Sequence, residues 1–172
     1  MKLILLLIFP ILTIAQTTNE RKIYLLDKKV ELSIPCQLVE MSDQAYKMKY
    51  NDRPRPAVAL SDKRGEVSLV GLITHQRANE SQILAYKDFQ ISELKKAHPD
   101  LQLIDGGLKT VRGKKVGCFR FLSQAVDQKI FNYYFFTVVD GEVVLFHFNC
   151  IQRLRANWES KAEQIVSSLI VE

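Results

Sequence analysis

The sequence is short of the residues and motifs that mark several large classes of protein. Its 172 residues include only 7 Gly, 5 Pro and 3 Cys, too few for a low-complexity linker or a disulfide-dense scaffold. It has no Gly-x-Ser-x-Gly elbow, phosphate-binding loop, His-Glu-x-x-His helix or paired-carboxylate motif. No two Cys or His residues have the spacing of metal ligands. The residues therefore predict no catalytic site, no metal site and no cofactor.

The overall composition is that of an ordinary folded domain. Hydrophobic residues make up 47% of the chain and charged residues 25%, which excludes a disordered or collagen-like protein. The length suits one domain with a short tail. We expect this single domain to occupy residues 29–172, after a polar leader or weak first strand at residues 16–28.

The amino terminus has the pattern of an export signal. Lys2 is followed by an uncharged run from Leu3 to Ile14, which matches a short secretory signal. A membrane-spanning helix needs roughly 20 apolar residues, so we expect no permanent anchor. Ala15 is a small residue where a signal peptidase would cut, so residues 1–15 are the predicted signal peptide and the mature protein is periplasmic or secreted.

The charge pattern gives no sign of a nucleic-acid partner. Loss of Lys2 on export would leave a formal charge of +4. The basic residues are spread along the chain without a block of five like charges, whereas nucleic-acid binders concentrate them in a stripe. A protein or an envelope component is the more reasonable partner.

Hydrophobic periodicity predicts an α+β fold with a mostly antiparallel sheet. Residues 29–35 alternate in polarity as a half-buried strand does, and residues 57–61 and 66–74 form a hairpin pattern. A short helical turn is expected at 39–46 and a short strand at 47–50. Further strands are expected at 101–104 and 108–111, around a turn or bulge, and at 115–123, 129–139 and 142–150.

Two amphipathic helices are expected to cover this sheet. The first opens at Asn79, where Gln82 completes a capping box, and stops before Pro99. Its predicted packed arc contains Ile83, Leu84, Tyr86, Ile91, Leu94 and Ala97. The second helix spans about 153–170, with an apolar stripe formed by Leu154, Trp158, Ala162, Ile165 and Leu169.

The Asp140-Gly141 pair sets the register of the last two strands and defines a candidate binding cluster. A two-residue type I′ turn at this pair would place Tyr134 opposite His147 and Asn132 opposite Asn149 on one face. These four side chains could bind a peptide or small ligand through hydrogen bonds. A sheet edge whose polar groups are all satisfied explains the same residues.

A second candidate binding element is the segment Arg53-Pro54-Arg55-Pro56. Each proline restricts itself and its predecessor to extended geometry, so Arg53 and Arg55 could form a stiff basic arm that loses little entropy on binding a partner. The same segment is also a good lead into the following strand.

The three cysteines are expected to be buried thiols. Cys118 and Cys150 fall on the first and third strands of the meander, so their backbones would be roughly 10 Å apart at two strand spacings. A disulfide needs Cα atoms within about 7 Å. We therefore expect no bridge between these two, while pairing of Cys36 with either one stays open.

The chain resembles the PsbP-like α/β/α sandwich family, which includes the bacterial DcrB envelope proteins and a nuclear Ran-binding protein. The resemblance covers roughly residues 28–170. It rests on the order of the strands and helices and on their residue patterns, not on a catalytic motif. The segments that carry it are Val30–Pro35, Val116–Phe121, Asn132–Phe136, Leu145–Cys150 and the closing helix from Trp158 to Leu169. The chain also resembles uncharacterised secreted proteins of Bacteroidetes-type bacteria that share the Arg-Pro-Arg-Pro segment.

This resemblance implies helices on both faces of the sheet and a non-enzymatic role as an assembly factor, chaperone or accessory subunit. The main hypothesis is therefore an exported binding protein that acts on an envelope or secreted protein. One alternative is a small hydrolase or ligand-processing enzyme that uses His147 or His75. Another is an immunity protein against a secreted toxin.

Overall fold

The structure, a computed structural model, describes residues 19–51 and 53–172. The helices are α1 (Asp43–Tyr50), α2 (Ile83–Ala97) and α3 (Arg155–Ser167). The strands are β1 (Glu20–Leu25), β2 (Val30–Pro35), β3 (Val39–Glu40), β4 (Val58–Ser61), β5 (Val67–Arg77), β6 (Gln102–Val111), β7 (Lys114–Gln124), β8 (Lys129–Val139), β9 (Glu142–Ile151) and β10 (Ile170–Val171). The predicted α+β class is confirmed.

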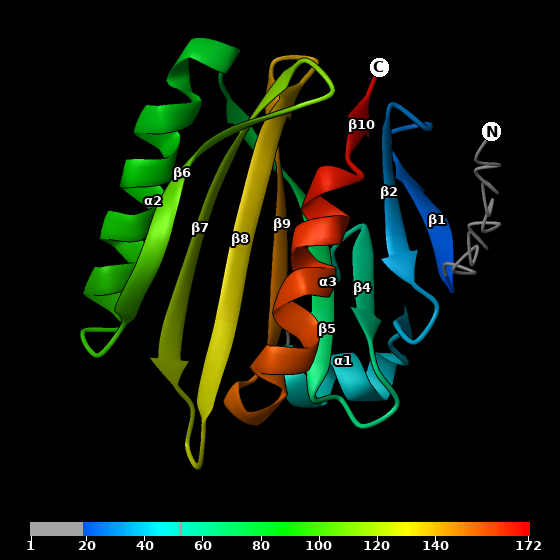
Figure 1. Ribbon diagram of the computed structural model, residues 1–172, viewed down its shortest axis with the longest axis vertical. Coiled ribbons are helices and arrows are strands. Elements are labelled where there is room, and N and C mark those ends of the chain that lie inside the picture. The colour runs from blue at the N-terminus through cyan, green and yellow to red at the C-terminus, as the bar shows by residue number, and fades with distance from the viewer. Residues whose placement is uncertain (1–18, 52) are drawn as a thin grey trace, which may run out of the picture.

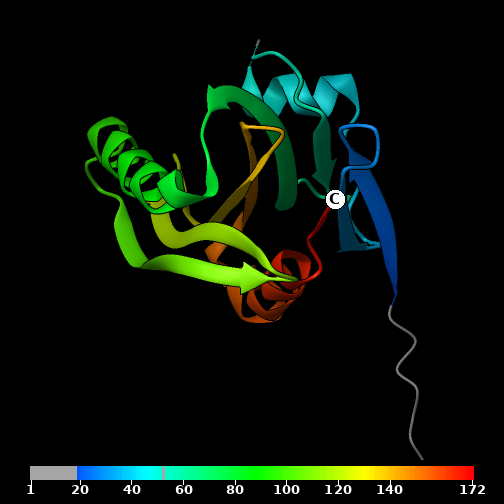
Figure 2. The same cartoon turned by 90° about the horizontal axis from the view of Figure 1, so that it is seen from above.

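The described strands form two antiparallel sheets (Figure 1). The larger has seven strands in the order β3-β4-β5-β9-β8-β7-β6, and the smaller has three in the order β1-β2-β10. Seen from above, α1 and α2 lie on one side of the large sheet, and α3 lies on the other side near the small sheet (Figure 2). Helices therefore cover both faces, as predicted.

The hairpin between β8 and β9 has the predicted register. Tyr134 pairs with His147 and Asn132 pairs with Asn149. Asp140 and Gly141 have φ angles of 51° and 78°, the pair of positive values that a type I′ turn requires. All three strands of the predicted meander, β7, β8 and β9, belong to the same sheet.

The larger hydrophobic core lies between the α3 face of the large sheet, α3 and the small sheet. The α3 stripe is buried as predicted, with Trp158 8% and Ile165 1% exposed. The Trp158 ring packs against Phe148, with a centroid separation of 6.1 Å. Leu32 and Ile34 of β2 enter the same core, which explains the alternating pattern of that strand.

The second face carries a smaller core beneath α2. The predicted capping box is present, since Asn79 N donates to Gln82 Oε1 and the Asn79 side chain accepts from Ser81 N. Ile83 is buried against the strand residues of this core. Leu84, which is 48% exposed, and Ala97, which is also exposed, were wrongly included in the packed arc. The side of α2 that contacts the sheet is narrower than the predicted arc.

Three predictions on the amino-terminal half need correction. The helical turn expected at 39–46 begins only at Asp43, and Val39–Glu40 is the short strand β3. Residues 47–50 are not a strand but the second half of α1. Ser42 caps this helix by accepting from Ala45 N, and the Tyr46 and Tyr50 rings, one turn apart, lie 5.0 Å from each other. The third correction concerns Val30–Pro35, which was expected as a strand of one common sheet but pairs with β1 and β10 in a separate small sheet.

The leader segment contains a strand. β1 pairs with β2 along its whole length, and its Leu25 belongs to the main core. Of the two possibilities at residues 16–28, the described part from residue 20 is a strand. The predicted signal peptide and its cleavage after Ala15 lie outside the described residues. No helix within the described ranges combines the length and the apolar character that a membrane crossing requires.

The three cysteines are free thiols, with Cys118 and Cys150 buried and Cys36 half-buried. Cys118 is level with Phe135, whereas Cys150 pairs with Phe131, four residues further along β8. Two strand spacings and this offset separate the two backbones by roughly 16 Å. The expected 10 Å was too short because it ignored the offset along the strands.

Candidate functional site

The strip of sheet between α1 and α2 carries two cross-strand rows of polar and aromatic side chains. In the first row, Ser68 of β5, Asn149 of β9 and Asn132 of β8 lie side by side. In the next row, His147 lies beside Tyr134. Their alternate positions along each strand direct all five side chains to the same face. Members of both rows line hollows on this face, so the rows form the floor of a groove.

The four residues of the predicted cluster are brought together. The His147 Nε2–H donates to Asn132 Oδ1 at 2.9 Å, and the His147 and Tyr134 rings are stacked with centroids 4.2 Å apart. Asn132 Nδ2 donates to Ser123 Oγ at 2.9 Å. Asn132 and Asn149 are each 5% exposed. The two asparagine side chains and His147 Nε2 already have partners, so this part of the floor is pre-organised.

Burial controls the protonation of the two aromatic members. It lowers the pKa of His147 to about 3, and the positive charge of Lys49 acts in the same direction. It also raises the pKa of Tyr134 to about 12. Both side chains are therefore neutral near pH 7. In that state His147 donates one hydrogen bond to Asn132 and stacks its uncharged ring on Tyr134.

Lys49 of α1 is the functional candidate that the sequence analysis missed. The helix directs its ammonium onto the sheet, where it donates to Ser68 Oγ at 2.9 Å, to Asn149 Oδ1 at 3.2 Å and to Gly65 O at 3.2 Å. Desolvation lowers the pKa of Lys49 to about 8. The available signal was the Ser42 cap, which starts a helix with Lys49 and Tyr46 on one face.

Two hollows flank Tyr50 on this face. The first has a volume of about 740 Å³ and contains Lys49, Asn132 and Asn149 in its lining. The second has a volume of about 610 Å³ and contains Tyr134 and His147. Both volumes lie within the range of small-ligand sites, about 300–1,000 Å³.

The Arg-Pro-Arg-Pro segment forms one wall of the second hollow, but its two arginines differ in role. Arg53 is exposed at this wall and faces the space above the aromatic floor. Arg55 donates to Met41 O and to Asp43 Oδ1, and its guanidinium lies 5.4 Å from the centroid of the Tyr46 ring. Arg55 therefore holds the segment to α1, and Arg53 is the arginine available to a partner.

The other two histidines contribute little to the floor. His75 is at a β-bulge with φ 55°, its side chain is 81% exposed, and its Nδ1 lies 3.5 Å from Glu142. His98 follows α2 and lines the first hollow. No group of three or more metal-ligating side chains occurs within residues 19–51 and 53–172.

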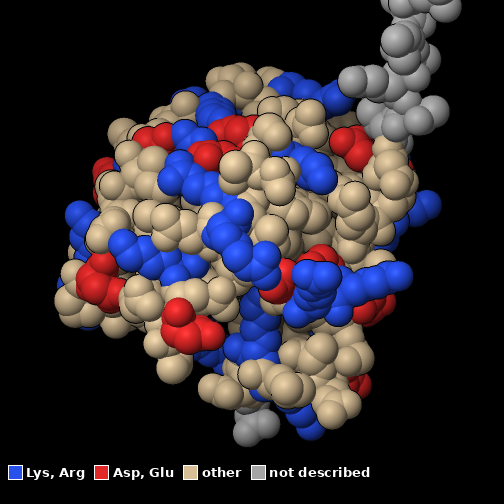
Figure 3. All heavy atoms as spheres, turned by 60° about the horizontal axis from the view of Figure 1, so that its bottom comes forward, with Lys and Arg blue, Asp and Glu red and all other residues tan. Residues whose placement is uncertain are grey.

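Basic side chains are prominent at the end of the molecule where the first hollow opens. Figure 3 brings this end forward, and Lys and Arg cover more of the visible surface than Asp and Glu. The turn between β4 and β5 contributes Lys63 and Arg64 to the hollow, together with Asp62 and Glu66. The rim is therefore of mixed charge, and the inward cation is Lys49.

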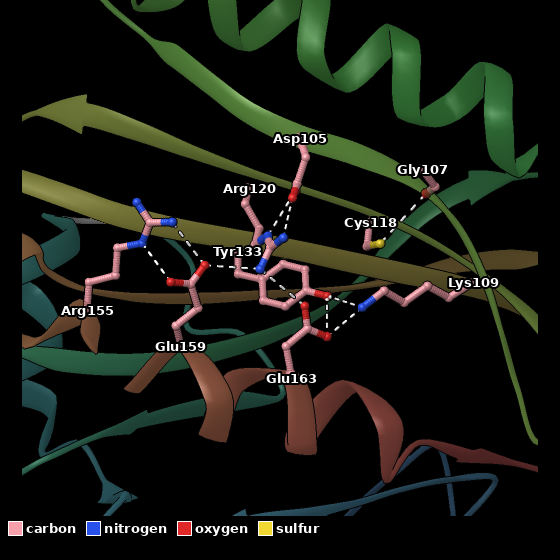
Figure 4. A network of polar contacts seen from close by, with 9 residues as sticks. All are labelled: Asp105, Gly107, Lys109, Cys118, Arg120, Tyr133, Arg155, Glu159 and Glu163. Carbon is pink, nitrogen blue, oxygen red and sulfur yellow. Dashed lines mark hydrogen bonds and ion pairs between the residues drawn. The ribbon is translucent and has the colours of Figure 1, made fainter. Parts of the chain in front are cut away.

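The opposite face contains a balanced ion network that holds α3 to the sheet (Figure 4). Glu163 accepts from Tyr133 Oη at 3.1 Å and pairs with Lys109. Arg120 joins Asp105 to Glu159 and Glu163, and Arg155 pairs with Glu159. Three cations balance three carboxylates, so this network has the character of a structural clamp rather than of a binding site.

No family model matches the chain, and no curated protein matches it. Solved structures do, over nearly the whole length. Cyanobacterial PsbP from Synechocystis is 12% identical, with a TM-score of 0.64 and coverage of 92% of this chain and 95% of that one. The chain has the PsbP-like sandwich fold.

Two further structures with this PsbP-like fold differ widely in their described roles. LpqN of Mycobacterium tuberculosis, described as involved in cell envelope biogenesis, is 15% identical, with a TM-score of 0.59 over 88% of this chain and 90% of that one. The Ran-binding protein Mog1p of Saccharomyces cerevisiae is 9% identical, with a TM-score of 0.54 over 90% and 96%. Identities this low establish the shared fold alone.

Proposed function

We propose that this chain is an exported, non-enzymatic accessory protein that binds an envelope or secreted protein in the second hollow. The observation that carries the proposal is the aromatic floor of Tyr134 and His147 beside the exposed Arg53. Rigid aromatic side chains and arginine are the groups that contribute most to protein recognition. A floor that is already hydrogen-bonded needs no rearrangement to receive a partner segment.

The wall of this hollow is also suited to binding. Pro54 and Pro56 restrict the backbone beside Arg53, and Arg55 fastens the segment to α1 through Asp43 and the Tyr46 ring. A partner would therefore order few residues on docking. The opposing wall is formed by apolar residues of β5, among them Leu72 and Ile73, which suit an extended apolar segment.

Export is part of this proposal and rests on the sequence of residues 1–15. The described role of LpqN in envelope biogenesis supports an envelope setting, and the Ran-binding role of Mog1p supports protein recognition on this fold. The hydrolase alternative has less support. His147 donates to Asn132 and stacks on Tyr134, while His75 faces Glu142, so neither is hydrogen-bonded to a nucleophile among the described residues.

A capture experiment with matched variants tests the proposal. The tagged mature protein is used to recover partners from the envelope fraction of its own cells, with Arg53→Ala and Arg112→Ala as the two variants. Arg112 is equally exposed but lies in the turn between β6 and β7, outside the second hollow. We expect one partner that the wild type and Arg112→Ala recover equally and Arg53→Ala recovers at least fivefold less. Equal recovery by both variants, or no partner, contradicts the proposal.

A further inference from the structure

The first hollow contains the ammonium of Lys49, which reaches the floor from a side chain that is itself largely exposed and which has no ion-pair partner among the described residues. Lys49 Nζ donates only to uncharged acceptors, namely Ser68 Oγ, Asn149 Oδ1 and Gly65 O. Within residues 19–51 and 53–172, no carboxylate lies within ion-pair distance of this ammonium, in contrast to the partly buried Lys109 and Lys87. Asp62 in the same hollow raises the pKa of Lys49 from beyond that distance, but desolvation outweighs it. An ammonium that is partly desolvated without a close counter-charge is costly, so its position at the floor of a hollow points to a bound anion.

The position of the ammonium leaves room for that anion. Ser68 is 0% and Asn149 5% exposed, so these two acceptors hold Lys49 on its inner side. The third acceptor, Gly65 O, belongs to the exposed turn between β4 and β5. A ligand oxygen can replace this carbonyl, which would then bind water. The exchange replaces a hydrogen bond from the ammonium to an uncharged carbonyl with a stronger one between two opposite charges.

Several side chains in the wall of the hollow are apolar. They include the buried side chains of Met41 and Ile151, with Ile130 and Ala45 further out. Met48 is 80% exposed and lies at the opening, where its flexible thioether can adapt to an apolar ligand. The space of about 740 Å³ accepts a molecule of eight to twelve heavy atoms with room to spare.

The cation itself favours a carboxylate over a phosphate. Lys49 is in the last turn of α1, where the helix dipole is negative and repels a dianion. Arg64 at the rim is exposed, and no arginine reaches the floor to provide the two-pronged donor that phosphate sites commonly use. A single charge on the ligand matches the single charge on the floor.

We propose that the first hollow binds a small apolar carboxylate, with its carboxylate on Lys49 Nζ and its apolar part against Met41, Met48 and Ile130. This site is separate from the protein-binding hollow proposed above, because neither Lys49 nor Met48 lines that hollow and Arg53 does not line this one. Failure of one proposal therefore leaves the other standing.

The test uses octanoate as the probe and calorimetric titration of the mature protein at pH 7. The matched variants are Lys49→Met and Lys47→Met, which remove one charge each from the same helix. Lys47 does not line the first hollow. We expect the wild type and Lys47→Met to bind octanoate with the same Kd and Lys49→Met to bind at least tenfold more weakly. Octyl phosphate should bind more weakly than octanoate, and uncharged 1-octanol should not discriminate among the three proteins.

Two outcomes overturn the proposal. One is the absence of octanoate binding to the wild type at millimolar concentration, and the other is an equal Kd for Lys49→Met and Lys47→Met. Circular dichroism establishes that each variant is folded, and Lys49→Gln replaces Lys49→Met if the latter does not fold. In the wild type, amide chemical shifts on octanoate addition should change at Gly65 and Met48 and stay unchanged at Arg53. The Arg53→Ala variant should bind octanoate like the wild type.

Discussion

Gly117 of β7 is the position where one added methyl group should disturb the fold most. A Cβ atom there would lie 2.4 Å and 2.5 Å from two ring carbons of Phe136 and 2.8 Å from Ile83 Cγ2. Phe136 and Ile83 are each 1% exposed, so neither has free space to move into. Overpacking of a dense core costs about 1–3 kcal/mol and occasionally more. For Gly117→Ala we expect a loss of about 3 kcal/mol, because α2 must lift away from the sheet.

Gly107→Ala provides the matched control for this substitution. Gly107 is on the neighbouring strand β6 and pairs with Cys118, but a Cβ atom there meets nothing within 4 Å. Both variants are unfolded by urea and, separately, by heat, and are followed by the fluorescence of Trp158, the single tryptophan. Gly117→Ala should lower Tm by about 6–12 °C, at about 2–4 °C per kcal/mol, and Gly107→Ala should stay within about 0.5 kcal/mol of wild type. Equal stability of the two variants would refute the packing of α2 described above.

Three further predictions concern protonation, thiols and the ion network. Burial lowers the pKa of His147 from 6.5 to about 3, so between pH 7 and pH 4 the unfolded chain binds a proton that the folded chain does not. The free energy of unfolding should therefore fall by roughly 2–3 kcal/mol from pH 7 to pH 4. In acid titrations, His147→Gln should remove this component. In a thiol titration without reductant, Cys36 should react fastest in the native protein, and all three cysteines should react after denaturation. Fewer than three reactive thiols after denaturation would reveal a disulfide. Glu163→Gln should lower the free energy of urea unfolding by about 1–2 kcal/mol. Its control, Glu93→Gln, breaks an exposed ion pair and should change this free energy by less than about 0.5 kcal/mol. Equal effects of the two substitutions would contradict a stabilising role for the ion network at α3.

The parts of the fold that the sequence predicts correctly are governed by local signals. Asp140-Gly141 determines a type I′ turn, and that turn determines every pair between β8 and β9. The capping box at Asn79 and the Trp158 stripe likewise depend on residues a few positions apart. Where the neighbouring residues alone decide the geometry, the sequence was sufficient.

The small sheet could not be predicted, because its pairings join distant segments. β10 at Ile170–Val171 pairs with β2 near the other end of the chain. Two residues are too few to show the alternating polarity that predicts a strand. β1 has mostly exposed side chains, so it lacks the alternation that identifies a half-buried strand. Register in these strands depends on the assembled core.

The candidate site was predicted in part for the same reason. The cluster around Tyr134 and His147 follows from the hairpin register. Lys49 was missed because residues 47–50 were assigned to a strand, and α1 reaches the floor only through tertiary packing against β4 and β5. The separate roles of Arg53 and Arg55 depend on a contact with Met41 O, which no sequence pattern indicates.

The central claim is that this protein binds its partner at the groove between α1 and α2. Site-specific photo-crosslinking in living cells tests it most directly, with the photoreactive residue placed either at Ala57, which is exposed beside the second hollow, or at Asn157, which is exposed on α3. We predict a discrete crosslinked partner from position 57 and none from position 157. A partner captured from position 157 alone, or equally from both positions, would contradict the claim.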